Sequence, residues 1–396
     1  MQPPDGILWP SPKLASLCGL LDRREGASWS FPEPDLVALA RRHRVEPLLY
    51  VLLAAATDGW RPAKATMDAL AQDYRKNTAR VLQSIAWLQQ LTQSLAIKGI
   101  ETRPLKGLPI AALAYDRIAD RHCGDLDLLT GSHRSRNRAD QVVRGSGLRP
   151  DPFEMAAAPR RIYRALHKDD SYFSPDGLRI ELHYHRDGIG QHVFPDFLVF
   201  GSGAWQTCRV ESTVTHRLHG TPLLLYLLSH GTRSRWHRLK WLLDIRRLTR
   251  HFDTDAWMEL QNAARQEHME LQALIGLRLL NRAFDVPSLS ALQSCSGVHR
   301  LGFAVRQCQI NLNDESASLH LTHPVRTAIR TTLYDVLLQR TGRARLAVVS
   351  NVLIRSQDIA RWRLPMPLIL LLAPIVRPFS LVYRRTLRPL IRRLFH

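Results

Sequence analysis

Cysteine is scarce in this 396-residue sequence, and the five that occur stand far apart. No two of them form a Cys-x-x-Cys pair, and an odd number cannot complete a set of disulfides. Small disulfide-stapled folds and zinc ribbons are therefore excluded. We expect no disulfide partner and a cytoplasmic location.

The sequence also lacks the apolar segments that carry proteins into or across membranes. Its first residues show no basic stretch followed by an apolar core, so we expect no secretory signal. The longest apolar run, 364–376, contains three prolines. It is shorter than the roughly 18 to 20 residues that span a bilayer, so we expect no transmembrane helix.

Acidic residues are outnumbered, with 35 Asp and Glu against 55 Lys and Arg, which gives a formal charge of +20. The segment 340–396 contributes most to this excess, since twelve arginines alternate there with apolar residues and only Asp358 is acidic. A helix with this pattern has an apolar stripe beside a cationic face. It suits peripheral contact with a membrane or a nucleic acid, or it packs its stripe against the rest of the protein.

The sequence is typical of a globular protein, because 45% of its residues are hydrophobic and it is long enough for two or three domains. The pattern predicts two short helices within 35–56 and one long helix over 62–98 that ends at Gly99. After residue 205 the chain is expected to be almost wholly helical, with a Ser-rich link near 287–298.

Between these helical regions the sequence changes to that of an α/β module. Residues 100–107 and 125–130 are typical of strands, with a short helix between them and another over 132–144. The turn signal Ser-Pro-Asp-Gly at 174–177 predicts a hairpin. We therefore predict an α+β fold with a small mixed sheet. Its regions are an N-terminal helical region 1–99, an α/β core 100–204, a helical domain 205–339 and a basic amphipathic helical tail 340–396.

Three carboxylates stand in the predicted strands. Asp125 and Asp127 are two residues apart in Gly-Asp-Leu-Asp-Leu-Leu, so both lie on one face. Like charges held side by side repel, and a fold tolerates them at an exposed edge or around a divalent cation. Glu181 has the same setting in Arg-Ile-Glu-Leu-His. Beside the first two it would complete a site able to hold two Mg²⁺ ions for phosphoryl transfer.

One of only seven lysines, Lys106, precedes Gly107 at the end of a predicted strand. Its ammonium group, together with backbone N–H groups freed by the glycine, is suited to a triphosphate. His183 shares a strand face with Glu181. Each of these patterns occurs often by chance, and it is their order along the chain that points to phosphoryl transfer.

In this order the residues resemble the nucleotidyltransferase superfamily of the DNA polymerase β type. They are most similar to an uncharacterised bacterial nucleotidyltransferase family often found with polysaccharide or peptide-natural-product biosynthesis genes. The matching blocks are Leu105-Lys106-Gly107, 121–129 and Glu181-Leu182-His183. RRHRVEPLLY and HGTRSRWHRLKWLLDI also look similar, so the resemblance covers roughly residues 35 to 250.

The resemblance implies an enzyme that needs Mg²⁺ or Mn²⁺. It would transfer a nucleoside monophosphate from an NTP, expected to be ATP, to a hydroxyl of a small molecule, sugar or protein, and release pyrophosphate. Asp125, Asp127 and Glu181 would be the catalytic metal ligands, and Lys106, Gly107 and Arg121 would bind the nucleotide. Its implied accessory residues are His183, His230, Arg238, Lys240 and Asp244.

Alternatives stay open. The last four accessory residues also fit a plain amphipathic helix, on which Lys240 and Asp244 have the spacing of an ion pair. A glycosyltransferase uses Asp-x-Asp as well, but helices stand here where its nucleotide-binding βαβ series belongs. A catalytically silent adaptor would bind membrane or nucleic acid through the basic tail, and polymerase relatives also suggest an RNA acceptor.

Overall fold

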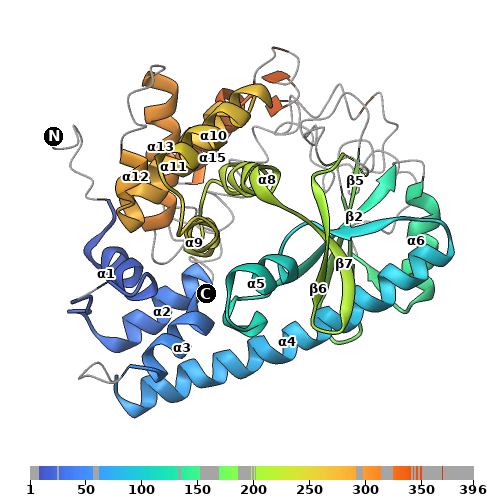
Figure 1. The fold of residues 1–396 in the computed structure, drawn as a ribbon, viewed down its shortest axis with the longest axis horizontal. Coiled ribbons are helices and arrows are strands. Elements are labelled where there is room, and N and C mark those ends of the chain that lie inside the picture. Colours follow the sequence, from blue (N-terminus) through green and yellow to red (C-terminus); the bar gives the residue numbers. More distant parts are fainter. Residues whose placement is uncertain are drawn as a thin grey trace.

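The chain forms a helical part and a smaller α/β part that one long helix connects (Figure 1). The computed structural model describes residues 9–24, 26–56, 62–132, 135–151, 169–185, 202–290, 298–313 and 324–339, with a few single residues elsewhere. The α-helices are α1 Pro12–Leu21, α2 Glu33–His43, α3 Glu46–Ala54, α4 Lys64–Ile97, α5 Leu108–Ala114, α6 Arg136–Gly145, α8 Gly220–Arg233, α9 Leu239–Leu248, α10 Thr254–Gln266, α11 Glu270–Phe284, α12 Pro287–Ser290, α13 Val298–Asn313 and α15 Pro324–Leu337. The strands are β1 Thr102–Pro104, β2 Asp125–Ser132, β3 Arg149–Pro150, β4 Asp169–Phe173, β5 Arg179–His185, β6 Trp205–Val210 and β7 Thr213–Leu218.

Helix α4 belongs to both parts of the molecule. Its 34 residues correspond to a rod of about 50 Å. Leu70, near its start, joins the helical core, whereas Val81, Leu88 and Leu95 pack under the sheet. The helix ends before Gly99, as the sequence predicted, and Gly99 has a left-handed φ of 67°, a conformation that favours glycine.

Two hydrophobic cores result from this arrangement. The larger core joins helices α1 to α3 with α8 to α11, α13 and α15, so the beginning of the chain packs against its last described helices. The smaller core lies between the second half of α4, helix α6 and the sheet. The N-terminal helices therefore depend on the C-terminal ones for burial of their apolar faces.

The main sheet has the strand order β1-β2-β5-β4-β3. Strands β2 and β5 are parallel and central, and the other neighbours are antiparallel. Leu126 and Leu128 point into the smaller core, as the two-residue period predicted. Asp125 and Asp127, which alternate with these leucines, consequently lie on the opposite face.

Most local predictions are confirmed by the structure. The two short N-terminal helices, the long helix, strand β2 and the hairpin of β4 and β5 are all present. The expectation of helix after residue 205 is wrong for 205–218, which forms the antiparallel hairpin β6–β7. Thr213, Val214 and Thr215 favour a strand because branching at Cβ restricts their side chains in a helix.

The predicted basic tail falls almost entirely outside the described residues, and so does the second half of the Ser-rich link. In the part of the chain that is described, no helix combines the length and the apolar character needed to cross a bilayer.

Candidate functional site

Three carboxylates gather where β2 and β5 run side by side. Asp127 on β2 is the register partner of Glu181 on β5, and Asp125 precedes Asp127 by two residues on the same face. The exposed fraction of the side chain is 3% for Asp127, 15% for Glu181 and 32% for Asp125. The group thus extends from the interior of the protein to solvent.

Lys106 supplies the positive charge nearest to the two aspartates. Its Nζ donates a hydrogen bond to Asp127 and lies 3.8 Å from Oδ1 of Asp125. The backbone places it there, because Leu105 N–H donates to the Asp127 carbonyl at 3.0 Å and Gly107 turns the chain into α5 with a φ of 80°. A side chain at position 107 would be strained in this conformation.

Burial and charge oppose each other in this ion pair. Burial lowers the pKa of Lys106, but the carboxylates of Asp127 and Asp125 outweigh it and raise the pKa above its usual value. Burial raises the pKa of Asp127, but Lys106 and the hydrogen bond from His183 hold it well below the ordinary value. Both groups are therefore charged at neutral pH.

His183 lies closer to the carboxylates than an accessory role requires. Its Nε2 is 3.0 Å from Asp127 Oδ1 and 3.5 Å from Glu181 Oε2. Glu181 also pairs with Arg179, through Oε1 at 3.1 Å. Two carboxylate oxygens and one imidazole nitrogen, from Asp127, Glu181 and His183, all lie within 4.8 Å of one another.

This donor set fits a divalent cation. Carboxylate oxygens are the preferred ligands of Mg²⁺, and Mn²⁺ also accepts an imidazole nitrogen. Asp125 shares Lys106 with Asp127, so it is close enough to offer a further oxygen. The structure thus brings together Asp125, Asp127, Glu181, Lys106 and His183.

Arg121, expected to bind the nucleotide, forms a buried ion pair with Asp244 of α9. The guanidinium Nε lies 2.9 Å from Oδ1, and Nη2 lies 2.7 Å from Oδ2. The hydroxyl of Tyr115 donates to the same Oδ1 at 2.8 Å. This bidentate contact fastens the segment before β2 to the helical part.

The prediction of an ion pair between Lys240 and Asp244 is wrong. Asp244 is engaged by Arg121 and Tyr115, and across the described chain Lys240 has no hydrogen bond or ion pair. Lys240 is nevertheless buried, at 5% exposure. Burial and the charge of Arg121 lower its pKa to about 7, against the opposing effect of Asp125.

The other two accessory residues contact different partners. His230 lies against the rings of Tyr226 and Trp241, with centroids 6.3 and 5.3 Å away. Arg238 donates to the backbone carbonyl of Arg42. Both contacts hold helices together.

Helix α8 adds two residues that sequence reasoning missed. Burial raises the pKa of the Tyr226 hydroxyl. The charge of Lys106 lowers this pKa, and the charges of Asp127 and Glu181 raise it. The charge of Arg233, seven residues later, lowers the pKa of the same hydroxyl. A spacing of seven residues places both on one helix face, a signal that was readable in the sequence.

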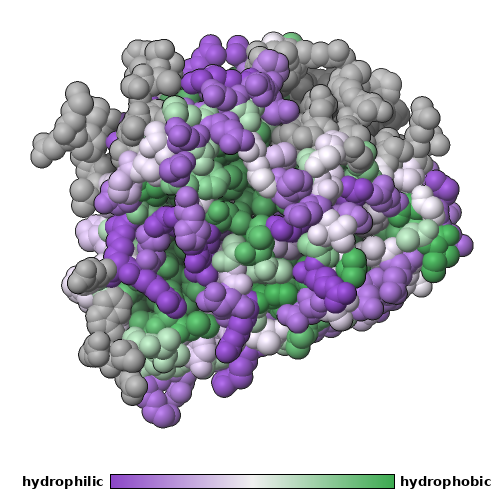
Figure 2. Space-filling view, viewed as in Figure 1, coloured by the Kyte–Doolittle hydropathy of each residue, from purple (hydrophilic) through white to green (hydrophobic). Residues whose placement is uncertain are grey.

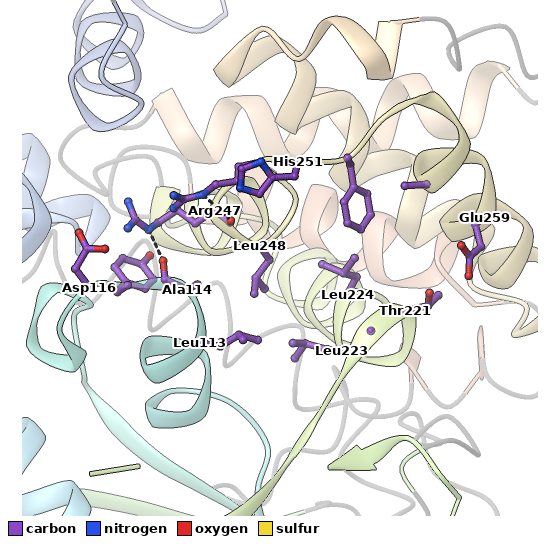
Figure 3. A pocket seen from close by; sticks show the side chains of 15 residues that line it. Leu113, Ala114, Asp116, Thr221, Leu223, Leu224, Arg247, Leu248, His251 and Glu259 are labelled. Carbon is purple, nitrogen blue, oxygen red and sulfur yellow. Dashed lines mark hydrogen bonds between the residues drawn. The ribbon is translucent and has the colours of Figure 1, made fainter. Parts of the chain in front are cut away.

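A pocket of about 690 Å³ opens at the other end of α5 (Figure 3). Its floor is apolar, with Leu113, Leu223, Leu224 and Leu248, and Arg247 and Glu259 lie at its rim. Figure 2 shows hydrophobic residues gathered in the middle of the face seen in Figure 1. The seven-residue helix α5 separates this pocket from Lys106 by roughly 10 Å, so the pocket is distinct from the carboxylate group.

A family model described as an uncharacterised nucleotidyltransferase matches residues 30–285. The match extends from α2 to α11 and includes every residue of the carboxylate group, together with Lys106, α8 and α9. No curated protein and no solved structure matches the chain. Since the family model covers well over half of the 396 residues, the chain belongs to the family of uncharacterised nucleotidyltransferases.

Proposed function

We propose that the protein is a metal-dependent nucleotidyltransferase that moves a nucleoside monophosphate from an NTP, ATP being the expected one, to a hydroxyl of an acceptor. The main support is the register of β2 and β5, which sets Asp127 beside Glu181 with Asp125 on the same face. Family membership supports the same reaction class.

Asp125, Asp127 and Glu181 would hold Mg²⁺ or Mn²⁺, which would supply charge stabilisation at the transferred phosphate and lower the pKa of the attacking hydroxyl. Asp127 is suited to this role because its low pKa keeps the carboxylate ionised across the neutral range. The hydrogen bond from His183 Nε2 fixes the orientation of that carboxylate.

Lys106 is the chain's own cation at the reaction centre. It is buried and charged, and its position beside the Gly107 turn lets it offset negative charge on the triphosphate. We assign Arg121 a positioning role, because its guanidinium is already bound by Asp244.

The reaction balances without a further reactant. The acceptor oxygen forms a bond to the α-phosphorus while the bond to the β-phosphate oxygen breaks, and pyrophosphate leaves with that electron pair. The hydroxyl proton passes to solvent.

The test is transfer of label from each α-labelled NTP with Mg²⁺ or Mn²⁺, first with the protein alone and then with cell extract as the source of acceptor. Wild type is compared with Asp127→Asn and with the control Asp68→Asn, which changes an exposed aspartate of α4. We expect transfer to be lost only in Asp127→Asn. Equal transfer in all three proteins would overturn the assignment of the site to Asp127, and no NTP binding by folded wild type would overturn the proposed reaction and favour the silent adaptor.

A further inference from the structure

Two basic side chains beside Asp125 stand without partners. Lys240 is the second residue of α9 and is 5% exposed. Arg44 is half-buried and caps the end of α2. Throughout the described residues neither side chain makes a hydrogen bond or an ion pair.

Arg44 lies directly against the strand end that bears Asp125. A Cβ built at Gly124 would lie 3.0 Å from the Nη1 atom of Arg44, so the absence of a side chain at Gly124 makes room for the guanidinium. Burial lowers the pKa of His122, and the nearby charges of Lys240 and Arg44 lower it further, against the opposing effect of Glu46. Both cations are therefore close to the same short segment, 122–125.

The nearby acids are already engaged. Asp244 accepts from Arg121 and Tyr115, and Glu46 pairs with the Nδ1 atom of His122 at 2.6 Å. Asp125 belongs to the proposed metal site and lies close to Lys106. This leaves the positive charges of Arg44 and Lys240 without a dedicated carboxylate.

The position of Lys240 is unfavourable for a purely structural lysine. A cation in the first turn of a helix opposes the helix dipole, and burial of an unpaired ammonium costs further free energy. Arg238, at the N-cap of α9, makes no side-chain hydrogen bond to the first turn, and the first N–H of the helix, at Leu239, donates to Nδ1 of His43 at 3.1 Å. Burial and the charges of Arg121 and Arg44 lower the pKa of Lys240 to about 7, which is the expected state of a cation that lacks its anion.

We propose that Arg44 and Lys240 form a phosphate-binding site beside Gly124 and Asp125, at the N-terminal end of α9. A guanidinium fork and an ammonium are complementary ligands for a phosphate. The site deepens the proposed nucleotidyl transfer and rests on it for the source of this phosphate. That source is either the terminal phosphates of the NTP or a phosphorylated acceptor.

The test measures binding of inorganic pyrophosphate without metal, in EDTA, by isothermal titration calorimetry. Wild type is compared with Lys240→Met, Arg44→Gln and the control Lys98→Met, which changes an exposed lysine at the end of α4. We expect each site variant to lose about tenfold or more in affinity, and the control to bind as wild type does. Wild-type affinity in both site variants would overturn the site.

A thermal measurement guards against loss of folding in the variants. Pyrophosphate should raise the unfolding temperature of wild type and of Lys98→Met, and raise that of folded Lys240→Met and Arg44→Gln clearly less. An equal rise in all four proteins would count against the site.

Competition identifies the source of the phosphate. If ATP displaces pyrophosphate from wild type, the site holds the nucleotide's terminal phosphates, and if both bind together, it holds a phosphate of the acceptor. The site and the reaction can also fail separately. Selective loss of pyrophosphate binding in a protein that transfers no label would keep the site and reject the reaction, whereas label transfer with wild-type binding in both variants would do the reverse.

Discussion

Replacing Lys240 by Met should make the protein more stable. The pKa of Lys240 falls from 10.5 to about 7 in the folded protein, chiefly through burial, a difference that corresponds to roughly 5 kcal/mol. Methionine keeps the unbranched shape and removes the charge that burial disfavours. We expect the free energy of unfolding to rise by roughly 4 kcal/mol at pH 7, where nearly all of this cost applies.

The gain should shrink as the pH rises. Between pH 7 and 10.5 the unfolded chain binds a proton at Lys240 more strongly than the folded protein does, so wild-type stability increases with pH over this window. The advantage of Lys240→Met should therefore fall to about 2 kcal/mol at pH 9.

Urea denaturation at pH 7, 8 and 9 measures this difference, with Lys98→Met as a control that removes an exposed lysine. The control should match wild type at every pH. A Lys240→Met protein that is less stable than wild type, or whose advantage is constant from pH 7 to pH 9, would refute the reasoning.

Three other changes have defined outcomes. Asp244→Asn leaves its guanidinium partner buried and unpaired, and should lower the urea-derived free energy of unfolding by about 3 to 5 kcal/mol; a loss below about 1 kcal/mol would show that the pair contributes little. Gly231→Ala puts a methyl group 2.4 Å from the ring of Trp236 and should lower the unfolding temperature, whereas Gly302→Ala has open space and should not; equal melting of the two variants would contradict the packing. Deletion of the residues after Arg361 should weaken sedimentation with anionic vesicles, and a wild-type protein that ignores such vesicles would remove the membrane hypothesis.

Short-range periodicity explains what the sequence could predict. The two-residue period of a strand places Asp125 and Asp127 on one face of their strand. The same period places Glu181 and His183 on one face of theirs. Pairing of β2 with β5 is different, because the two strands are far apart in the chain. Their parallel register, which sets Asp127 beside Glu181, depends on how α6, β3 and β4 fold between them.

Contacts between residues far apart in the chain also explain why the predicted ion pair between Lys240 and Asp244 does not form. Lys240 and Asp244 are four residues apart on a helix, a spacing at which opposite charges can pair. This spacing predicted their contact. Arg121 and Tyr115 come from distant parts of the chain and reach Asp244 with better geometry and in a buried setting. A long-range contact of this kind overrides a weak local preference and cannot be recognised from spacing.

The dual membership of α4 sets the limits of any shortened version of this protein. A fragment that starts at residue 100, where the sequence pattern changes, would lose Val81, Leu88 and Leu95 and would expose the apolar underside of the sheet. A fragment that starts within α4 keeps these side chains but loses Arg44 and the helices that cover α9. The smallest piece that keeps the candidate site is therefore expected to include α2 at one end and to extend through α11 at the other, so domain excision cannot separate this site from the helical part.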